Sequence, residues 1–177
     1  MWRLVLVLVL ATLGFACGSS EPGSNSEIYF RNLEAGYGAY DAEVEQLTEE
    51  YDRLLPSATS DAAVDQNRID LLREVLASHS TFGDALSALT PPSSLEAEHR
   101  ILLDRVAELE EAWLDDLALM ETGTASSDPV ERSAERQAVF EAVDALARAC
   151  LDLQAAAGAQ SIDVTLPCSL AGPPLDS

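Results

Sequence analysis

Hydrophobic residues recur at spacings of three and four in four long runs of the sequence, which is the pattern of amphipathic α-helices. Helix-breaking residues end the runs, with Pro56 after the first, Pro91-Pro92 after the second, and Gly123 and Gly158 after the third and fourth. No alternating stretch of comparable length predicts a β-strand. The four stripes comprise Tyr37, Tyr40, Val44, Leu47, Tyr51 and Leu54; Ile69, Leu72, Leu76, His79 and Leu86, with Val75 and Phe82 beside them; Leu95, His99, Leu102, Val106, Leu109, Trp113, Leu117 and Met120; and Val139, Val143, Leu146, Cys150 and Leu153.

Three of the predicted helices carry recognisable start signals. Ser60 precedes the second run as an N-cap residue, and Asp128 precedes the fourth with Pro129 at the first helical position. Ser93 and Glu96 have the spacing of a capping box, in which each side chain accepts a hydrogen bond from a free backbone N–H. The first run contains no such signal.

The pattern predicts an all-α fold: an up-down-up-down antiparallel four-helix bundle over residues 27–157. Each helix would have roughly 28 residues and a length of about 40 Å, and short linkers favour antiparallel neighbours. Gly36 and Gly38 predict a kink in the first helix or a separate short helix before it, because glycine costs up to about 1 kcal/mol per helical position. Residues 158–177 are expected to form an extended tail across one end of the bundle.

The N-terminus has the composition of an export signal. Residues 4–16 are almost wholly apolar and follow one positive charge at Arg3. The run is shorter than the ~20 residues that cross a membrane as a helix, so residues 1–16 are predicted to be a signal peptide.

Two cleavage routes are open at the end of this run. Gly14-Phe15-Ala16 forms a small-x-small site for ordinary secretory cleavage. The segment also resembles a bacterial lipoprotein signal, in which the cysteine after the apolar run is lipidated. Ala16 before Cys17 fits that family, whereas Gly14 stands where the family usually has an aliphatic residue. The Ser- and Gly-rich composition of residues 17–26 predicts a flexible tether.

The three cysteines are consistent with an exported chain. An odd number leaves one unpaired, and if Cys17 carries lipid, Cys150 and Cys168 can form a disulfide. Disulfides persist in oxidising compartments. The alternative, that Cys150 and Cys168 are catalytic or metal-binding thiols, has little support because neither belongs to a C-x-x-C pair.

The charge balance disfavours some partners. The 177 residues include 31 Asp and Glu against ten basic residues, all of them Arg, for a net charge of −21. Such a surface repels phosphate backbones and anionic lipid headgroups, so we expect no nucleic-acid partner. Most of these charges are expected to solvate helix faces.

The strongest candidate for chemistry is Glu96-x-x-His99, the spacing with which ferritin-like bundles present two ligands on one helix face. No second Glu-x-x-His exists, because the only other histidine, His79, has Leu76 three residues before it. A simpler metal site would combine His79 and His99 with a carboxylate such as Glu98 or Asp104. The competing interpretation is that both histidines belong to the core or its edge, with ordinary hydrogen bonds.

Other chemistry has less support. The stripe residues Tyr37, Tyr40, Tyr51 and Trp113 could line a ligand cavity between helices, although an aromatic stripe is more often core. No Ser, His and Asp order, phosphate loop or calcium loop is recognisable. The sequence therefore predicts neither a catalytic residue nor a cofactor.

One segment resembles a known group of proteins. Leu86, Leu89, Pro91-Pro92, Leu95, His99 and Leu102-Leu103 form an LxxLxPPxxLxxxHxxLL pattern. The pattern resembles a segment of uncharacterised exported bacterial proteins, often lipoproteins with helical-bundle folds, and this resemblance implies no activity.

The combined expectation is a cell-envelope lipoprotein facing the periplasm or exterior, held to the membrane by lipid on Cys17. It would act as a non-enzymatic binding or structural module, with an envelope protein as a further partner. The alternatives are a bundle that sequesters a metal or small ligand through His79, His99 and Glu98, and an enzyme of unrecognised type.

Overall fold

The computed structural model describes residues 22–126 and 128–169, and in these ranges the chain is helical with no strand. The all-α prediction is therefore confirmed. The elements are α1 (Pro22–Leu54), η1 (Leu55–Ser57), α2 (Asp61–Ser87), η2 (Ser93–Leu95), α3 (Glu96–Glu121), α4 (Pro129–Glu135) and α5 (Gln137–Ala159), where η marks a short 3₁₀ helix.

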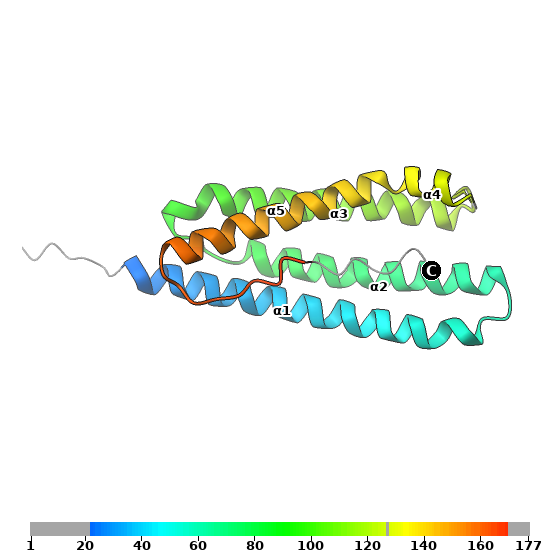
Figure 1. Ribbon diagram of the computed structural model, residues 1–177, viewed down its shortest axis with the longest axis horizontal. Coiled ribbons are helices and arrows are strands. Elements are labelled where there is room, and N and C mark those ends of the chain that lie inside the picture. The colour runs from blue at the N-terminus through cyan, green and yellow to red at the C-terminus, as the bar shows by residue number, and fades with distance from the viewer. Residues whose placement is uncertain (1–21, 127, 170–177) are drawn as a thin grey trace, which may run out of the picture.

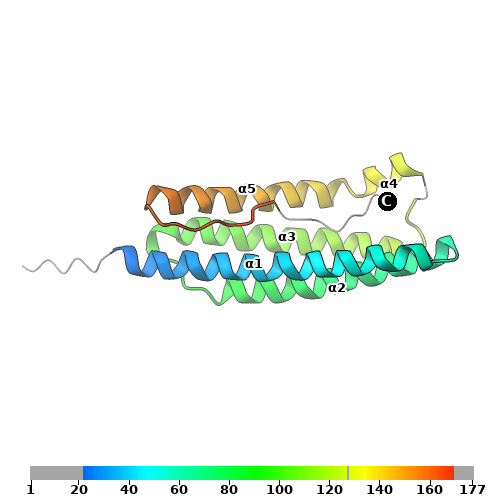
Figure 2. The same ribbon diagram turned by 60° about the horizontal axis from the view of Figure 1, so that its bottom comes forward.

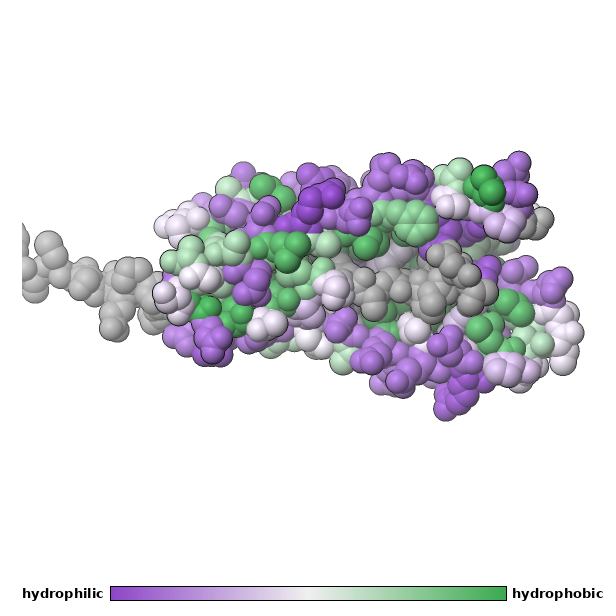
Figure 3. Space-filling model, in the orientation of Figure 1, coloured by the Kyte–Doolittle hydropathy of each residue, from purple (hydrophilic) through white to green (hydrophobic). Residues whose placement is uncertain are grey.

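The long helices lie side by side along the longest axis of the molecule (Figures 1 and 2). α1 packs against α2, α2 against α3, and α3 against α5. After α5 the chain reverses and runs back along the molecule between α5 and α1 in both views. Figure 3 shows the face of the molecule that is turned toward the viewer in Figure 1. Purple hydrophilic residues gather along the upper and lower margins of that face, and green hydrophobic residues gather between them in its left half.

The predicted stripes form the core. Of the stripe residues, only Leu54 is exposed, at 43% of its surface. Leu47, Leu117, Met120 and Val143 are half-buried and pack against the core. The remaining stripe residues are buried. Removing this much apolar surface from water is the main favourable term in the folding of such a chain.

α1 begins earlier than the sequence predicted. It is one continuous helix from Pro22 to Leu54, so the prediction of a separate short helix before Gly36 and Gly38 is wrong. Its first turns include residues 22–26, for which the composition predicts a flexible tether. The stripe continues toward the N-terminus through the buried side chains of Tyr29, Phe30 and Leu33. Burial of these side chains stabilises α1 enough to offset the ~1 kcal/mol that each glycine costs.

Two of the three predicted helix starts are confirmed. The Ser60 hydroxyl accepts a hydrogen bond from the Ala63 N–H at 3.2 Å, and one Asp128 carboxylate oxygen accepts from the Val130 and Glu131 N–H groups at 2.9 and 3.1 Å. The capping box is wrong, since no side chain caps η2 or α3.

A backbone 3₁₀ turn, and not a side-chain cap, precedes α3. Ser93 to Leu95 form the 3₁₀ turn, and the Leu95 N–H donates to the Pro92 carbonyl at 2.8 Å. Pro91-Pro92 lie in the connection between α2 and η2, and the 3₁₀ turn of η2 leads directly into α3.

The fourth predicted helix is two helices, because the α-helical run breaks at Arg136 between α4 and α5. Backbone hydrogen bonds still cross the break, from the Arg136 N–H to the Arg132 carbonyl and from the Phe140 N–H to the Arg136 carbonyl. Arg136 is 4% exposed and its side chain turns inward toward α3. The break therefore coincides with a buried polar contact that the hydrophobic pattern does not encode.

Candidate functional site

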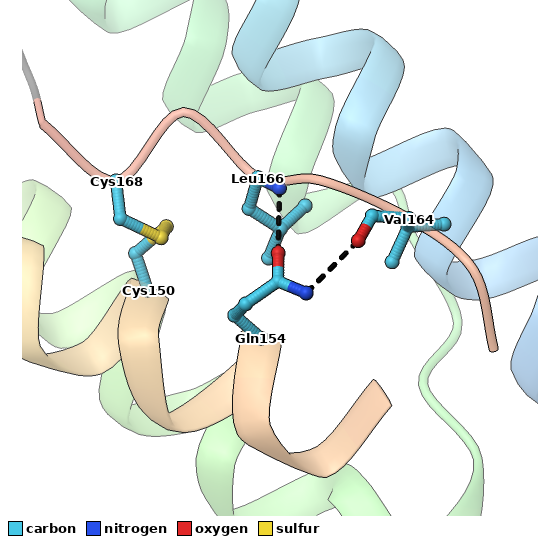
Figure 4. Close-up of a disulfide and its surroundings, with 5 residues drawn as sticks. All are labelled: Cys150, Gln154, Val164, Leu166 and Cys168. Carbon is cyan, nitrogen blue, oxygen red and sulfur yellow. Dashed lines mark hydrogen bonds between the residues drawn. A yellow bond between two sulfur atoms is a disulfide. The ribbon is translucent and has the colours of Figure 1, made fainter. Parts of the chain in front are cut away.

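The segment after α5 is held in place by side chains that bind its backbone. The Gln154 Nε2 donates to the Val164 carbonyl at 2.9 Å, and the Leu166 N–H donates to the Gln154 Oε1 at 2.7 Å (Figure 4). From the other side, Glu34 of α1 accepts from the Thr165 N–H at 2.7 Å. Val164 and Leu166 are buried. We call residues 162–168 the strap, because it joins α1 to α5.

A disulfide between Cys150 and Cys168 fixes the end of the strap to α5, with the two Cα atoms 5.4 Å apart (Figure 4). The predicted pairing of these two cysteines is thus present. The predicted path is wrong, however, because the strap lies along the bundle rather than across one end. Ser161, with a φ of 56°, provides the left-handed turn that reverses the chain. Cys17 lies outside the described residues.

His79 is a core residue with both ring nitrogens engaged. Its Nε2 donates to the Val106 carbonyl at 2.8 Å, and its Nδ1 accepts from the Tyr40 hydroxyl at 3.3 Å. The indole of Trp113 packs edge-on at 5.0 Å between ring centroids. Burial lowers the pKa of His79, so this arrangement stabilises the neutral ring.

His99 has a separate environment. Its Nδ1 lies 3.0 Å from the Tyr29 hydroxyl, and burial lowers its pKa as well. It precedes Val106, the partner of His79, by seven residues, or about 10 Å along α3. The structure does not bring His79, His99 and Glu98 together as one ligand set. Within residues 22–126 and 128–169, no group of three or more His, Cys, Asp or Glu side chains could hold a metal ion.

The aromatic stripe also packs into the core. Tyr37 and Tyr40 contact Phe82 of α2 with ring centroids 4.9 and 4.8 Å apart. Tyr51 and Trp113 are each 2% exposed. Burial raises the pKa of the Tyr37 and Tyr40 hydroxyls well above the usual value. These side chains therefore fill the space that a ligand cavity would require.

A buried ion cluster joins α3 to α4 and α5, and sequence reasoning missed it. Asp116, at 2% exposure, lies 2.5 Å from the Arg132 Nη2 and 3.7 Å from the Arg136 Nε. Arg132 also reaches Glu135 at 3.3 Å, and the Arg136 guanidinium lies 5.1 Å from the Phe140 ring centroid. The charge pattern predicts that acidic residues mostly solvate helix faces, and Asp116 departs from this expectation. The available signal was the spacing of Arg132 and Arg136, which places both on one face of a helix.

A pocket of about 430 Å³ opens at the end of the molecule where α1 begins. α1 contributes one wall and the connection between α2 and η2 contributes the other. All of its lining residues are uncharged: Asn25, Ile28, Tyr29, Asn32, Ala88, Leu89, Thr90, Pro91 and Pro92. The sequence does not reveal this pocket, because its α1 wall lies in the predicted tether and in residues that precede the first predicted stripe.

Comparison of the chain with protein-family models, with curated proteins and with solved structures found no match. Among the described residues, none of the helices is long and apolar enough to cross a membrane. Any functional assignment therefore depends on the residues and contacts of this chain.

Proposed function

We propose that the chain is an exported cell-envelope lipoprotein, anchored through lipid on Cys17, whose helical domain is a non-enzymatic binding or structural module. One observation carries the proposal. Pairing of Cys150 with Cys168 accounts for two of the three cysteines in the sequence, and the third, Cys17, directly follows the apolar run.

Compartment and chemistry support the same conclusion. A structural disulfide favours an oxidising compartment, which an export signal would reach. Acyl chains on a cysteine bury CH₂ groups at about 0.8 kcal/mol each, so two or more chains give firm anchoring.

The buried polar groups support a binding or structural role. His79 bonds a helix carbonyl and a tyrosine, His99 contacts a second tyrosine, and Asp116 pairs with arginines. Each of these groups is engaged in holding helices together. The metal-sequestering alternative receives no support from this arrangement, because a ligating His79 would have to give up one of its hydrogen bonds.

We also infer an up-down-up-down order, with α4 and α5 together serving as the fourth helix. The support comes from the sequence of packed neighbours, α1 on α2, α2 on α3 and α3 on α5, and from the short connections between them. The strap lies between the first and last helices of this series, where a closed bundle has a direct helix contact.

The intact mass of the mature protein tests the anchor. The full chain is produced in a bacterial host and compared with its Cys17→Ser variant, each alkylated with and without reduction. We expect a polypeptide that begins at Cys17 and carries acyl mass, with two alkylations only after reduction, and no acyl mass on the variant. An unmodified chain whose Cys17 alkylates without reduction would overturn the proposal. Turnover in hydrolase and redox screens, lost on replacement of one side chain, would overturn the non-enzymatic part.

A further inference from the structure

The pocket at the start of α1 has an uncharged lining in a strongly acidic protein. Acidic residues number 31 of 177, yet the pocket lining contains no charged residue. The whole stretch 85–95, which connects α2 to α3, is also uncharged. Ile28 stands at this surface with 59% of its area exposed. We call the pocket lining together with residues 85–95 the neutral end.

The neutral end lies close to the proposed anchor. Only four residues separate Cys17 from Pro22, where α1 begins. Five extended residue steps span at most about 18 Å, at about 3.3–3.6 Å each. α1 itself has 33 residues, so its far end is about 50 Å from the near end along the axis. A lipid on Cys17 would hold the neutral end, and not the far end, within reach of the bilayer.

We propose that the neutral end is the surface that contacts the lipid bilayer, so that the bundle stands on the membrane with η1 and α4 directed away from it. This inference depends on the proposed lipidation of Cys17. Charge complementarity selects the surface: carboxylates lose hydration and are repelled by anionic headgroups, whereas amide, hydroxyl, proline and aliphatic groups approach the interface at little cost. Ile28 and the proline pair then meet the interfacial region, where apolar side chains gain from burial.

Site-specific fluorescence on the lipidated full chain tests this contact. Ile28→Cys and Thr90→Cys place a single reactive thiol at the neutral end, and Leu54→Cys and Val130→Cys serve as matched variants at the far end. All four positions are exposed. Each variant is labelled without reduction, so that Cys150 and Cys168 stay paired, and is inserted into phosphatidylcholine vesicles containing a nitroxide-labelled lipid. Quenching of the fluorophore then reports its distance from the bilayer surface.

We expect quenching at positions 28 and 90 to be at least about twofold stronger than at positions 54 and 130. Adding Ile28→Asp to the Thr90→Cys variant should reduce the quenching at position 90, because a carboxylate disfavours approach to the interface. Equal quenching at both ends, or stronger quenching at the far end, would overturn the inference while leaving the anchor intact. The label count separates the two proposals, because two labels per chain would mean a free Cys17 and would overturn the lipidation itself.

Discussion

Besides packing against α3, α5 is held to the rest of the molecule near its two ends by different chemistry. Near its C-terminal end, the strap provides a disulfide and backbone hydrogen bonds to Gln154 and Glu34. At its N-terminal end, the contact is the cluster of Asp116 with Arg132 and Arg136. The strap is attached to α5 by a covalent bond as well as by hydrogen bonds. The ion cluster has no covalent bond, and its charges balance only while all its members are present. The attraction between paired buried charges offsets part of their desolvation cost, and removal of one partner leaves the cost of the other unbalanced.

The ion cluster should give the largest single effect. Asp116→Ala leaves two arginines facing a buried site without their carboxylate, and we expect a loss of about 3–5 kcal/mol in the free energy of unfolding. Urea-induced unfolding monitored by circular dichroism measures it.

Asp115→Ala is the matched control for this experiment, because Asp115 is the adjacent but exposed carboxylate. Its effect should stay within about 0.5 kcal/mol. A loss below about 1 kcal/mol for Asp116→Ala would mean that solvent reaches the arginines, and the contrast between the two attachments would disappear.

Removal of the disulfide should rank next. Cys150 and Cys168 are 18 residues apart, and replacing both with Ser should cost roughly 3 kcal/mol according to the chain-entropy estimate. The melting temperature should fall by several degrees.

Combination with Asp116→Ala tests the comparison directly, because the two attachments share no described contact and the losses should add within about 0.5 kcal/mol. A much smaller combined loss would show that both depend on one cooperative docking of α5.

The two attachments also differ in how far sequence could reveal them. The stripes, the caps at Ser60 and Asp128 and the cysteine pairing follow from local spacing and from counting, so they were predictable. The partner of Asp116 lies on a different helix, and no periodicity in one helix identifies a contact in another. An acidic residue in a chain with this much acid is also far more often solvated.

The neutral end escaped prediction for a related reason. Its pocket combines the first turns of α1 with the connection after α2, two segments that each appear to be unremarkable linkers in isolation. The continuity of α1 through Gly36 and Gly38 was equally hidden, because helix propensity is a weak guide when Tyr29, Phe30, Leu33 and Tyr37 are buried on one face. Local rules failed wherever tertiary packing determined the outcome.

Acid should weaken the core between the two attachments. Burial lowers the pKa of His79 in the folded chain, so below the unfolded value of about 6.5 the unfolded chain binds more protons than the folded one. Stability is therefore full above that pH and falls as the pH drops through and below it, by at most about 1.4 kcal/mol per pH unit for one proton.

Unfolding free energies measured from pH 8 to pH 5 test this dependence. His79→Gln should flatten the slope below pH 6.5, whereas His99→Gln, at the less enclosed histidine, should leave most of it. If His79→Gln retains the full slope, another group must control the acid response.

The smallest effect should come from the side chain that binds the strap backbone. Gln154→Ala removes two hydrogen bonds, to the Val164 carbonyl and the Leu166 N–H, and we expect a cost of about 1–2 kcal/mol. The disulfide still holds Cys168, so the loss should be mainly local. The exposed Gln160→Ala is the matched control. Hydrogen exchange at the Leu166 amide should accelerate roughly tenfold, the factor that about 1.4 kcal/mol represents, without comparable change in α3. If Gln154→Ala instead destabilises the whole chain as much as loss of the disulfide does, then hydrogen bonding to the strap, and not the covalent link, is what holds α5 at this end.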